Sequence, residues 1–273
     1  FWELEQGADC GTFSLRGYRP TTIAVAGSNE VTREPTSENP RNNATTPTDY
    51  RTTEARLQLS VRTKLAQGLF RYGERGSDSL WFGYSQLSTW QVFTPELSRP
   101  FRNTDHEPEF LYVTPVQSAR AGEWRLRLAG LGIVHQSNGQ SLPLSRSWNR
   151  VALLAAAEHD HFQLQGRVWN RIDEDAANDD NPRISDYIGR AELVARWNVE
   201  RRNSFALTLR HSLKKDANGS ARLEWFHTLA DPGFGPPNGL RLQAQLFHGY
   251  GDTLVDYNRV RTVFSIGFSL VEW

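Results

Sequence analysis

The chain has 273 residues, a formal net charge of zero and a mean hydropathy of −0.58. A balanced charge gives no reason to expect a polyanionic partner, so we expect no binding to nucleic acid. No apolar run approaches the roughly 20 residues that a spanning helix requires, which excludes a membrane protein built of helices.

The first twelve residues are mixed and acidic, and we expect residues 1–12 to form an N-terminal tail. Cys10 is the only cysteine, so it cannot form an intrachain disulfide and is expected as a free thiol. Residues 13–273 form one domain, in which short segments alternate between apolar and polar side chains as two-faced β-strands do. Twelve strands are predicted, at residues 21–26, 56–61, 79–90, 109–117, 124–137, 148–159, 162–172, 187–197, 204–213, 220–229, 240–250 and 261–271.

The connections between these strands alternate in length. Long polar segments at residues 27–53, 92–106, 138–147 and 173–186 follow odd-numbered strands, and shorter ones follow most even-numbered strands, with residues 65–78 as an exception. An even number of strands with long loops at one end is typical of an outer-membrane barrel. Half of each strand then faces the interior, which accounts for the polar composition. We therefore predict an all-β fold, a twelve-stranded antiparallel transmembrane β-barrel.

The candidate chemistry lies where the fifth predicted strand meets the sixth. His135 and Ser137 are two residues apart, so on a strand both side chains face the same way. A hairpin centred on Leu142 places Asn149 across the ladder from His135, about 5 Å away at Cα. A hydroxyl nucleophile, a base beside it and a polar group that orients the base are the components of a catalytic triad. A polar strand end that runs into a turn is the alternative interpretation.

The face that carries this candidate triad is apolar. Leu131 and Ile133 share it with His135 and Ser137, and in a barrel such a face contacts lipid. The residues before Gly130 alternate in the opposite phase, which indicates a bulge or turn at Gly130 or a strand that starts elsewhere. With a periplasmic N-terminus, the triad lies at the outer leaflet, where a nucleophile meets lipid ester bonds. This position predicts hydrolysis of lipid acyl esters.

Several motifs between about residues 98 and 258 resemble those of the bacterial outer membrane phospholipase A family. They are His135-Gln136-Ser137-Asn138-Gly139, Ser145-Arg146-Ser147-Trp148-Asn149-Arg150, Pro100-Phe101-Arg102 with Glu107-Pro108, Asp179-Asp180-Asn181-Pro182, and Gly249-Tyr250-Gly251-Asp252 through Asp256-Tyr257-Asn258. The resemblance implies a twelve-stranded barrel that hydrolyses phospholipid acyl esters, requires calcium and is active as a homodimer. It implies Ser137 as nucleophile, His135 as general base and Asn149 as the residue that orients the imidazole. The backbone N–H of Gly139 would contribute to the oxyanion hole.

The resemblance also implies the calcium ligands, and calcium prefers oxygen donors. The Ser145 hydroxyl and the Gln140 backbone carbonyl match family ligands, and Ser98 would come from the partner subunit. Asp180 matches a carboxylate of a second calcium position. The aspartate that completes this second position in the family is Leu142 here, so its ligand set is incomplete in this chain.

Gln86 matches a polar residue on the lipid-facing dimer interface of the family. A polar side chain in that position gains by pairing with its mate across a two-fold axis. In the alternative interpretation, Gln86 faces the barrel interior. The predicted partners are thus a phospholipid substrate and a second copy of the chain, in the bacterial outer membrane with the active site toward the outer leaflet.

Two other groups of residues and two other functions compete with these assignments. His159 and His161 could begin a zinc site, but that needs a third ligand, and a polar turn is the simpler interpretation. The acidic residues 173–175 are interpreted as a solvated loop, with calcium binding as the alternative. A non-catalytic barrel, such as a porin or adhesin, and a soluble β-sandwich esterase are the competing functional hypotheses.

Overall fold

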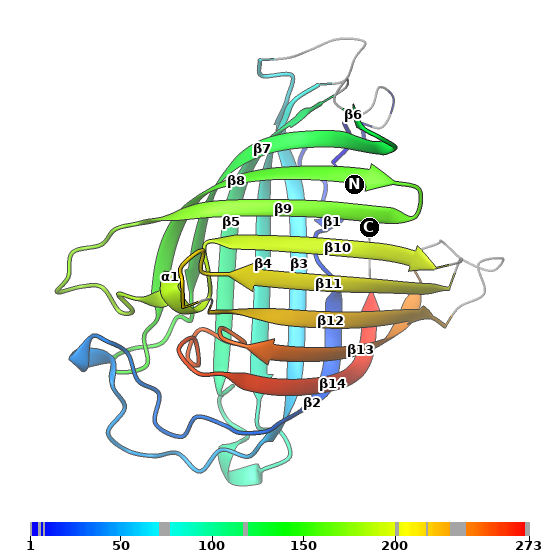
Figure 1. The fold of residues 1–273 in the computed structure, drawn as a ribbon. Coiled ribbons are helices and arrows are strands. Elements are labelled where there is room, and N and C mark those ends of the chain that lie inside the picture. Colours follow the sequence, from blue (N-terminus) through cyan, green and yellow to red (C-terminus); the bar gives the residue numbers. More distant parts are fainter. Residues whose placement is uncertain are drawn as a thin grey trace.

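The computed structural model describes residues 2–4, 7, 9–70, 77–116, 120–199, 202–216, 218–229 and 239–270. Within these residues, twelve long antiparallel strands pair side by side into a closed ring (Figure 1). The strands are β2 (Thr21–Ser28), β3 (Thr53–Gln67), β4 (Ser79–Trp90), β5 (Asn103–Pro115), β7 (Trp124–Ser137), β8 (Ser147–His159), β9 (Phe162–Ile172), β10 (Ala191–Val199), β11 (Asn203–His211), β12 (Gly219–Thr228), β13 (Leu240–Gly249) and β14 (Arg261–Leu270). This arrangement confirms the predicted all-β, twelve-stranded barrel.

The remaining elements are short. Two two-residue strands, β1 (Arg16–Gly17) and β6 (Arg120–Ala121), pair with β3 and β7. The helical turns are α1 (Ile184–Tyr187), η1 (Pro40–Asn42) and η2 (Pro95–Leu97). In the part of the chain that the structure describes, no helix has the length and apolar character needed to cross a membrane.

All twelve predicted strands overlap an observed one, but in three strands a predicted boundary is wrong by three residues or more. β3 is longer than predicted at both ends, β5 begins at Asn103 instead of residue 109, and β10 begins at Ala191 because α1 occupies residues 184–187. The missed start of β5 has a physical reason. Its inward side chains there are Asn103, Asp105 and Glu107, which are buried although they are polar. Polar residues therefore stand on both faces, and the apolar alternation that marks a strand is lost.

Outward and inward side chains differ sharply in character. On β7, Leu131 and Ile133 are 47% and 57% exposed, whereas Val134 is 4% exposed. On β13 and β14 the outward residues Leu246, Phe264 and Ile266 are likewise exposed. An apolar belt of this kind is typical of a barrel whose outer surface contacts lipid. Because the ring is closed, every strand is paired and no polar backbone edge meets the hydrocarbon.

The phase change in β7 comes from a bulge, and its position differs from the predicted one. The pairing with β8 shifts between Leu126 and Leu128, so the extra residue is Arg127, and the strand starts at Trp124 as predicted. Gly130 lies within the regular ladder opposite Leu154. A Cβ atom on Gly130 would be 2.6 Å from the Tyr112 carbonyl oxygen, so the glycine permits close approach of the neighbouring strand.

The barrel interior contains an apolar cluster toward each end. One consists of Trp2, Tyr18, Trp81, Leu111, Val113, Leu128 and Leu154. Trp2, from the segment predicted as a tail, thus packs inside the barrel, against the edge of the Trp81 ring. The other cluster consists of Trp148, Ile184, Ile188, Leu254 and Tyr257, under the loops at the end where β7 stops.

The long connections leave one end of the barrel, as the alternating loop lengths predicted. Residues 29–52, 91–102, 138–146, 173–190 and 250–260 all connect strands at that end, where α1 also lies (Figure 1, left). Loop 29–52 crosses over this end, and its Asn42 donates to the Ser145 carbonyl. The residues singled out for chemistry therefore meet at one rim of the barrel. The last residue of the twelfth predicted strand, residue 271, lies outside the described residues.

Candidate active site

The β7–β8 hairpin has the predicted register. His135 pairs with Asn149 and Ser137 pairs with Ser147 across the ladder. His135 Nδ1 lies 2.8 Å from Asn149 Oδ1, so the ring N–H donates to the amide carbonyl. No hydrogen bond joins Ser137 to His135 among the described residues, and in free enzymes this contact is often long. The structure therefore brings the three predicted catalytic side chains together on the apolar outer face.

The loop that follows Ser137 is organised by one buried amide. Asn138 is 3% exposed, and its Oδ1 accepts hydrogen bonds from the backbone N–H groups of Arg146, at 2.9 Å, and Gln140, at 3.4 Å. Its Nδ2 donates to the Leu144 carbonyl at 2.8 Å. Between them, Gly139 has φ = +61°, a conformation that glycine adopts without strain. The hydrogen bonds of Asn138 thus hold the loop on either side of Gly139, two residues after Ser137.

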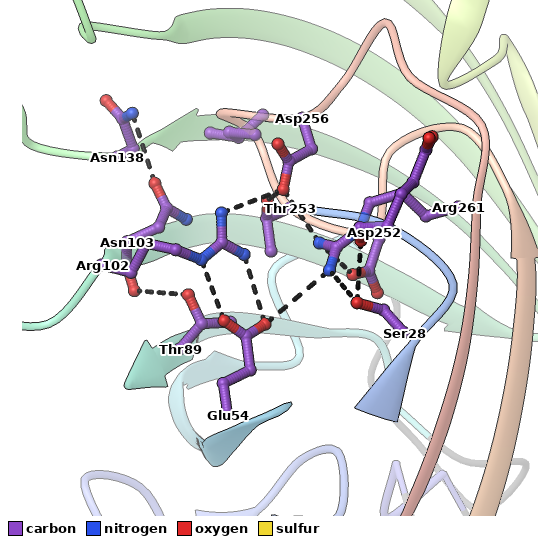
Figure 2. Close-up of polar contacts among 12 residues, drawn as sticks. Ser28, Glu54, Thr89, Arg102, Asn103, Asn138, Asp252, Thr253, Asp256 and Arg261 are labelled. Atoms are coloured by element: carbon purple, nitrogen blue, oxygen red, sulfur yellow. Dashed lines mark hydrogen bonds and ion pairs between the residues drawn. The ribbon is translucent and has the colours of Figure 1, made fainter. Parts of the chain in front are cut away.

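An ionic network lies inside the barrel next to this loop (Figure 2). Asn138 Nδ2 lies 3.4 Å from Asn103 Oδ1, and Gln140 Nε2 donates to the Arg102 carbonyl at 3.2 Å. The guanidinium of Arg102 binds Glu54 at 2.9 Å. The loop 138–146 therefore contacts the network through Arg102 and its neighbour Asn103.

The network balances three cations against three carboxylates, which come from the strands and from the loops at this end of the barrel. The charged members are Arg56, Arg102, Arg261, Glu54, Asp252 and Asp256. Burial by itself would raise the pKa of Asp252, but the Arg56 and Arg261 guanidiniums hold that pKa below its ordinary value. Arg102 and Arg261 lower the pKa of Asp256 in the same way. Each buried charge of the network therefore has a partner of opposite sign, and removing one partner would leave a costly imbalance.

Two of the predicted calcium ligands are brought together. Ser145 Oγ donates to Asp180 Oδ2 at 2.6 Å, and Asn42 Nδ2 donates to Asp180 Oδ1 at 3.0 Å. Both donors are uncharged, and no Lys or Arg of the described residues forms an ion pair with Asp180. Hydroxyl, carbonyl and carboxylate oxygens are the donor set that calcium takes. Among the described residues no three His, Cys, Asp or Glu side chains surround a common point, so this donor set is poor in charge.

The other predicted ligands lie apart. The Gln140 side chain faces Arg102 and Asn103, and its backbone carbonyl belongs to the loop that ends at Ser145. Ser98 lies in the β4–β5 connection, where its Oγ donates to the Pro95 carbonyl at 2.9 Å. Ser98 therefore lies on a different connection from Gln140 and Ser145, as expected for a calcium ligand that a partner subunit supplies. Leu142 is half exposed at the tip of the hairpin.

Gln86 lies on the outer face of β4, so the alternative of an interior position is wrong. Its strand neighbours Ser85 and Thr89 are buried inside, and Gln86 accepts from the Tyr84 hydroxyl at 2.9 Å. That hydroxyl also contacts His106 Nδ1 at 2.7 Å, and His106 pairs with Ser137 across the β5–β7 ladder. A polar row therefore runs along the outer surface from Gln86 to the candidate nucleophile.

Sequence reasoning missed Glu174, which does not behave as part of a solvated loop. Glu174 Oε1 accepts a hydrogen bond from Asn149 Nδ2 at 3.3 Å. Burial is the main cause that raises the pKa of Glu174. The signal was present in the β8–β9 hairpin, whose turn at Asp160 places Ile172 opposite Asn149. Glu174 is two residues further on, on the same face.

The histidines of that turn carry no sign of a metal site among the described residues. His159 Nε2 lies 2.7 Å from Glu123 Oε2, and Asp160 and His161 form the two-residue turn. A polar turn was the simpler interpretation, and the structure agrees with it.

A closed barrel of twelve antiparallel strands with an apolar outer belt defines a class, the transmembrane β-barrels of the bacterial outer membrane. The sequence family model described as Phospholipase A1 matches residues 1–270. The chain belongs to this family, whose members are enzymes, and its place is the bacterial outer membrane.

Individual relatives agree with this assignment. A protein of Neisseria meningitidis serogroup B is 38% identical over 216 residues, which cover 78% of this chain and 53% of that protein. Phospholipase A1 of Escherichia coli K12 is 31% identical over 220 residues, covering 80% of this chain and 69% of that protein. The chain thus spans about half the length of the Neisseria relative.

Solved structures match over nearly the whole barrel. Outer membrane phospholipase A from Escherichia coli has a TM-score of 0.80 at 26% identity, with 94% of each chain covered. The Salmonella typhi outer membrane phospholipase, solved as a dimer with bound calcium, has a TM-score of 0.81 at 26% identity and covers 97% of this chain and 94% of its own.

Proposed function

We propose that this chain is a calcium-dependent phospholipase A that hydrolyses acyl esters of phospholipids at the outer leaflet of the outer membrane. The observation that carries the proposal is the 2.8 Å hydrogen bond between His135 and Asn149, on the lipid face beside Ser137. Similarity to the Escherichia coli enzyme supports it, and that enzyme has also been solved as an asparagine-to-alanine active site mutant. A porin or adhesin would have no use for such a set on its outer surface.

In the proposed reaction, Ser137 Oγ attacks the ester carbonyl carbon while His135 Nε2 accepts the hydroxyl proton. Asn149 accepts the Nδ1–H and thereby keeps the Nε2 lone pair toward the serine. The tetrahedral intermediate collapses with transfer of that proton to the departing lysophospholipid oxygen, and water then hydrolyses the acyl-serine by the reverse sequence. An amide stabilises the imidazolium less than a carboxylate would, so Asn149 acts mainly by orientation.

The developing oxyanion needs preorganised positive partners. The Gly139 N–H is one, and its position is set by the hydrogen bonds of Asn138. The Ser145 hydroxyl and the Gln140 carbonyl would hold calcium, together with Ser98 of a second copy, and Asp180 adds a carboxylate beside Ser145. Bound calcium would supply positive charge for the oxyanion. Oxyanion donors are typically worth about 3–4 kcal/mol each.

A homodimer follows from the same geometry. The candidate site faces lipid, Gln86 presents an amide on the same surface, and Ser98 would reach the metal from another chain. A second barrel lying alongside in the membrane would complete the ligand set and cover the polar row. The Salmonella typhi relative, a dimer with bound calcium, supports this proposal.

The test is hydrolysis of phospholipid in detergent micelles, with calcium and then with excess chelator, for the wild type and Ser137→Ala. We expect calcium-dependent hydrolysis that Ser137→Ala lowers by at least about 10³-fold, the scale of losing a triad nucleophile. Heat-dependent gel migration checks that the variant forms a barrel. Activity indifferent to chelator would remove the calcium ligands from the proposal. A folded wild type without activity in either condition would point to a non-catalytic barrel.

A further inference from the structure

The Asn149 side chain is held from two sides, by groups on different elements. Its Oδ1 faces His135 Nδ1 at 2.8 Å on β7, and its Nδ2 faces Glu174 Oε1 at 3.3 Å just beyond β9. β8 lies between these two strands, and Asn149 pairs with His135 on one side and Ile172 on the other. Glu174 is therefore placed by the strand register, at the far side of the amide from the imidazole.

An amide can be rotated by half a turn, and the two orientations have opposite chemical consequences. A carboxylate only accepts hydrogen bonds, so Glu174 requires the Asn149 NH₂ group on its side. The carbonyl oxygen of Asn149 then faces His135 and holds the ring proton on Nδ1. The reversed amide would present its NH₂ to Nδ1 and move the ring proton to Nε2. In that state His135 could not accept the proton of Ser137.

We propose that Glu174 is a positioning residue that sets the orientation of the Asn149 amide and through it the tautomer of His135. This inference rests on the proposed function. It also explains why an amide, and not a carboxylate, suits the third position of the triad in this chain. An aspartate at position 149 would stand beside the Glu174 carboxylate, and two like charges at that distance destabilise each other.

The surroundings of Glu174 include charges of both signs. Arg171 favours its ionised form, while Asp179 and Asp180 oppose it, and the hydrogen bond from Asn149 favours it. Asp173 and Asp175, its neighbours along the chain, are exposed to solvent. Asp173 therefore offers a matched control: the same loop, the same charge and one residue away, with no hydrogen bond to Asn149 among those that the structure describes.

The experiment compares the wild type with Glu174→Gln, Asn149→Asp, the double variant and the control Asp173→Asn. kcat and KM are measured in micelles at saturating calcium across the neutral pH range. Glutamine can both accept and donate, so Glu174→Gln no longer selects one amide orientation. We expect kcat to fall about 10-fold with KM unchanged, because activity depends steeply on the orientation of the base. Asp173→Asn should match the wild type.

The decisive measurement is the effect of Glu174→Gln when residue 149 is aspartate. In the double variant, the amide introduced at position 174 can donate to the carboxylate introduced at position 149, whereas the native Glu174 repels that carboxylate. We therefore expect the same substitution that lowers kcat in the wild type to raise it in Asn149→Asp. Asn149→Asp alone should also show a pH profile displaced from that of the wild type, and the double variant should return toward it.

Three results would overturn the inference. Glu174→Gln could retain full activity, or it could lower kcat equally in both backgrounds, which is what a purely structural role predicts. It could also raise the calcium concentration needed for activity while kcat at saturation stays unchanged, and Glu174 would then act on the cation. A wild type without calcium-dependent hydrolysis would instead contradict the proposed function, so the two failures are distinguishable.

Discussion

Gly139 has a left-handed backbone conformation in the loop that follows Ser137. Its φ of +61° would cost a residue with a side chain about 1–2 kcal/mol. Space is not the obstacle, because a Cβ atom there would meet the His106 ring at 3.8 Å, an ordinary contact. The glycine is therefore explained by its backbone conformation and not by a lack of space.

We predict that Gly139→Ala lowers kcat by at least about 10-fold and leaves KM nearly unchanged. A tilted N–H would stabilise the oxyanion of the transition state less, whereas binding of the uncharged ester would hardly change. Steady-state kinetics in micelles measure this. The control is Gly27→Ala, since a Cβ atom at Gly27 meets nothing within 4 Å and its φ is ordinary. Unchanged kcat in Gly139→Ala would remove this N–H from the oxyanion hole.

At the scale of elements, the loop 250–260 is fastened to the strands by buried charge. Asp252 bonds to Arg56 on β3 and to Arg261 on β14, and all three side chains are at most 6% exposed. The loop in turn supports β5, because the Leu254 N–H donates to Asp105 at 2.9 Å. β5 lies directly beside β7, which carries the candidate nucleophile.

We predict that Asp252→Ala lowers the free energy of unfolding by roughly 3–5 kcal/mol at neutral pH, since it removes the carboxylate that both Arg56 nitrogens bind and leaves that buried guanidinium only a 3.6 Å contact with Glu54. The neighbouring arginines lower the folded-state pKa of Asp252, so its stabilisation is present above the unfolded pKa of about 4 and is lost as pH falls through the folded value. The difference between wild type and variant should therefore shrink in acid.

Denaturant unfolding at several pH values measures this difference. Asp49→Ala is the control, because Asp49 pairs with Arg33 and Arg51 where all three side chains are more than half exposed. Exposed pairs contribute about 0–1 kcal/mol. A loss for Asp252→Ala that does not exceed that of Asp49→Ala would show that the network is not a stabilising support.

At the scale of the whole molecule, the apolar belt fixes the barrel in the membrane and leaves its polar outer residues with few partners. Gln86 accepts from Tyr84 and donates to Ser88 at 3.1 Å, so its amide is oriented before any second barrel arrives. Orientation in advance lowers the entropic cost of pairing. The row from Gln86 to His106 would lie against the second copy.

We predict that Gln86→Ala weakens homodimerisation by about 1 kcal/mol, the scale of a polar pair within a membrane. Chemical cross-linking in calcium-containing micelles measures the dimer fraction, and activity at low protein concentration should fall with it. The control is Asn170→Ala, the same type of change on the outward face of β9, four strands away in the ring. Equal dimer fractions in both variants would place the interface elsewhere.

Much of this protein could be predicted from local pattern. In segments such as Leu240 to Leu246, apolar and polar side chains alternate because one face of the strand meets lipid and the other faces the interior. The twelve strands were predicted from this alternation, and the barrel from their even number and their loop lengths. The hairpin register also followed, because a hairpin centred on Leu142 pairs residues whose numbers sum to 284. His135 and Asn149 were placed opposite each other by that argument alone.

The errors and omissions share one cause, which is that they depend on contacts between distant segments. The polar start of β5 is a strand because Asn103 and Asp105 find partners inside the barrel, among them Asn138 and the loop 250–260. The motif from Gly249 to Asn258 resembled the family, yet its role as a charged support became visible only with Arg56 and Arg261 beside it.

The sequence by itself thus determined the features that depend on residues close together in one strand or one hairpin. These are the barrel, its lipid face and the common position of Ser137, His135 and Asn149. Only the tertiary structure decided which polar groups complete that set. Glu174 is 25 residues from Asn149 along the chain, and their 3.3 Å contact arises because β9 returns beside β8. A loop carboxylate shows its role only when the fold supplies its partner and removes it from water.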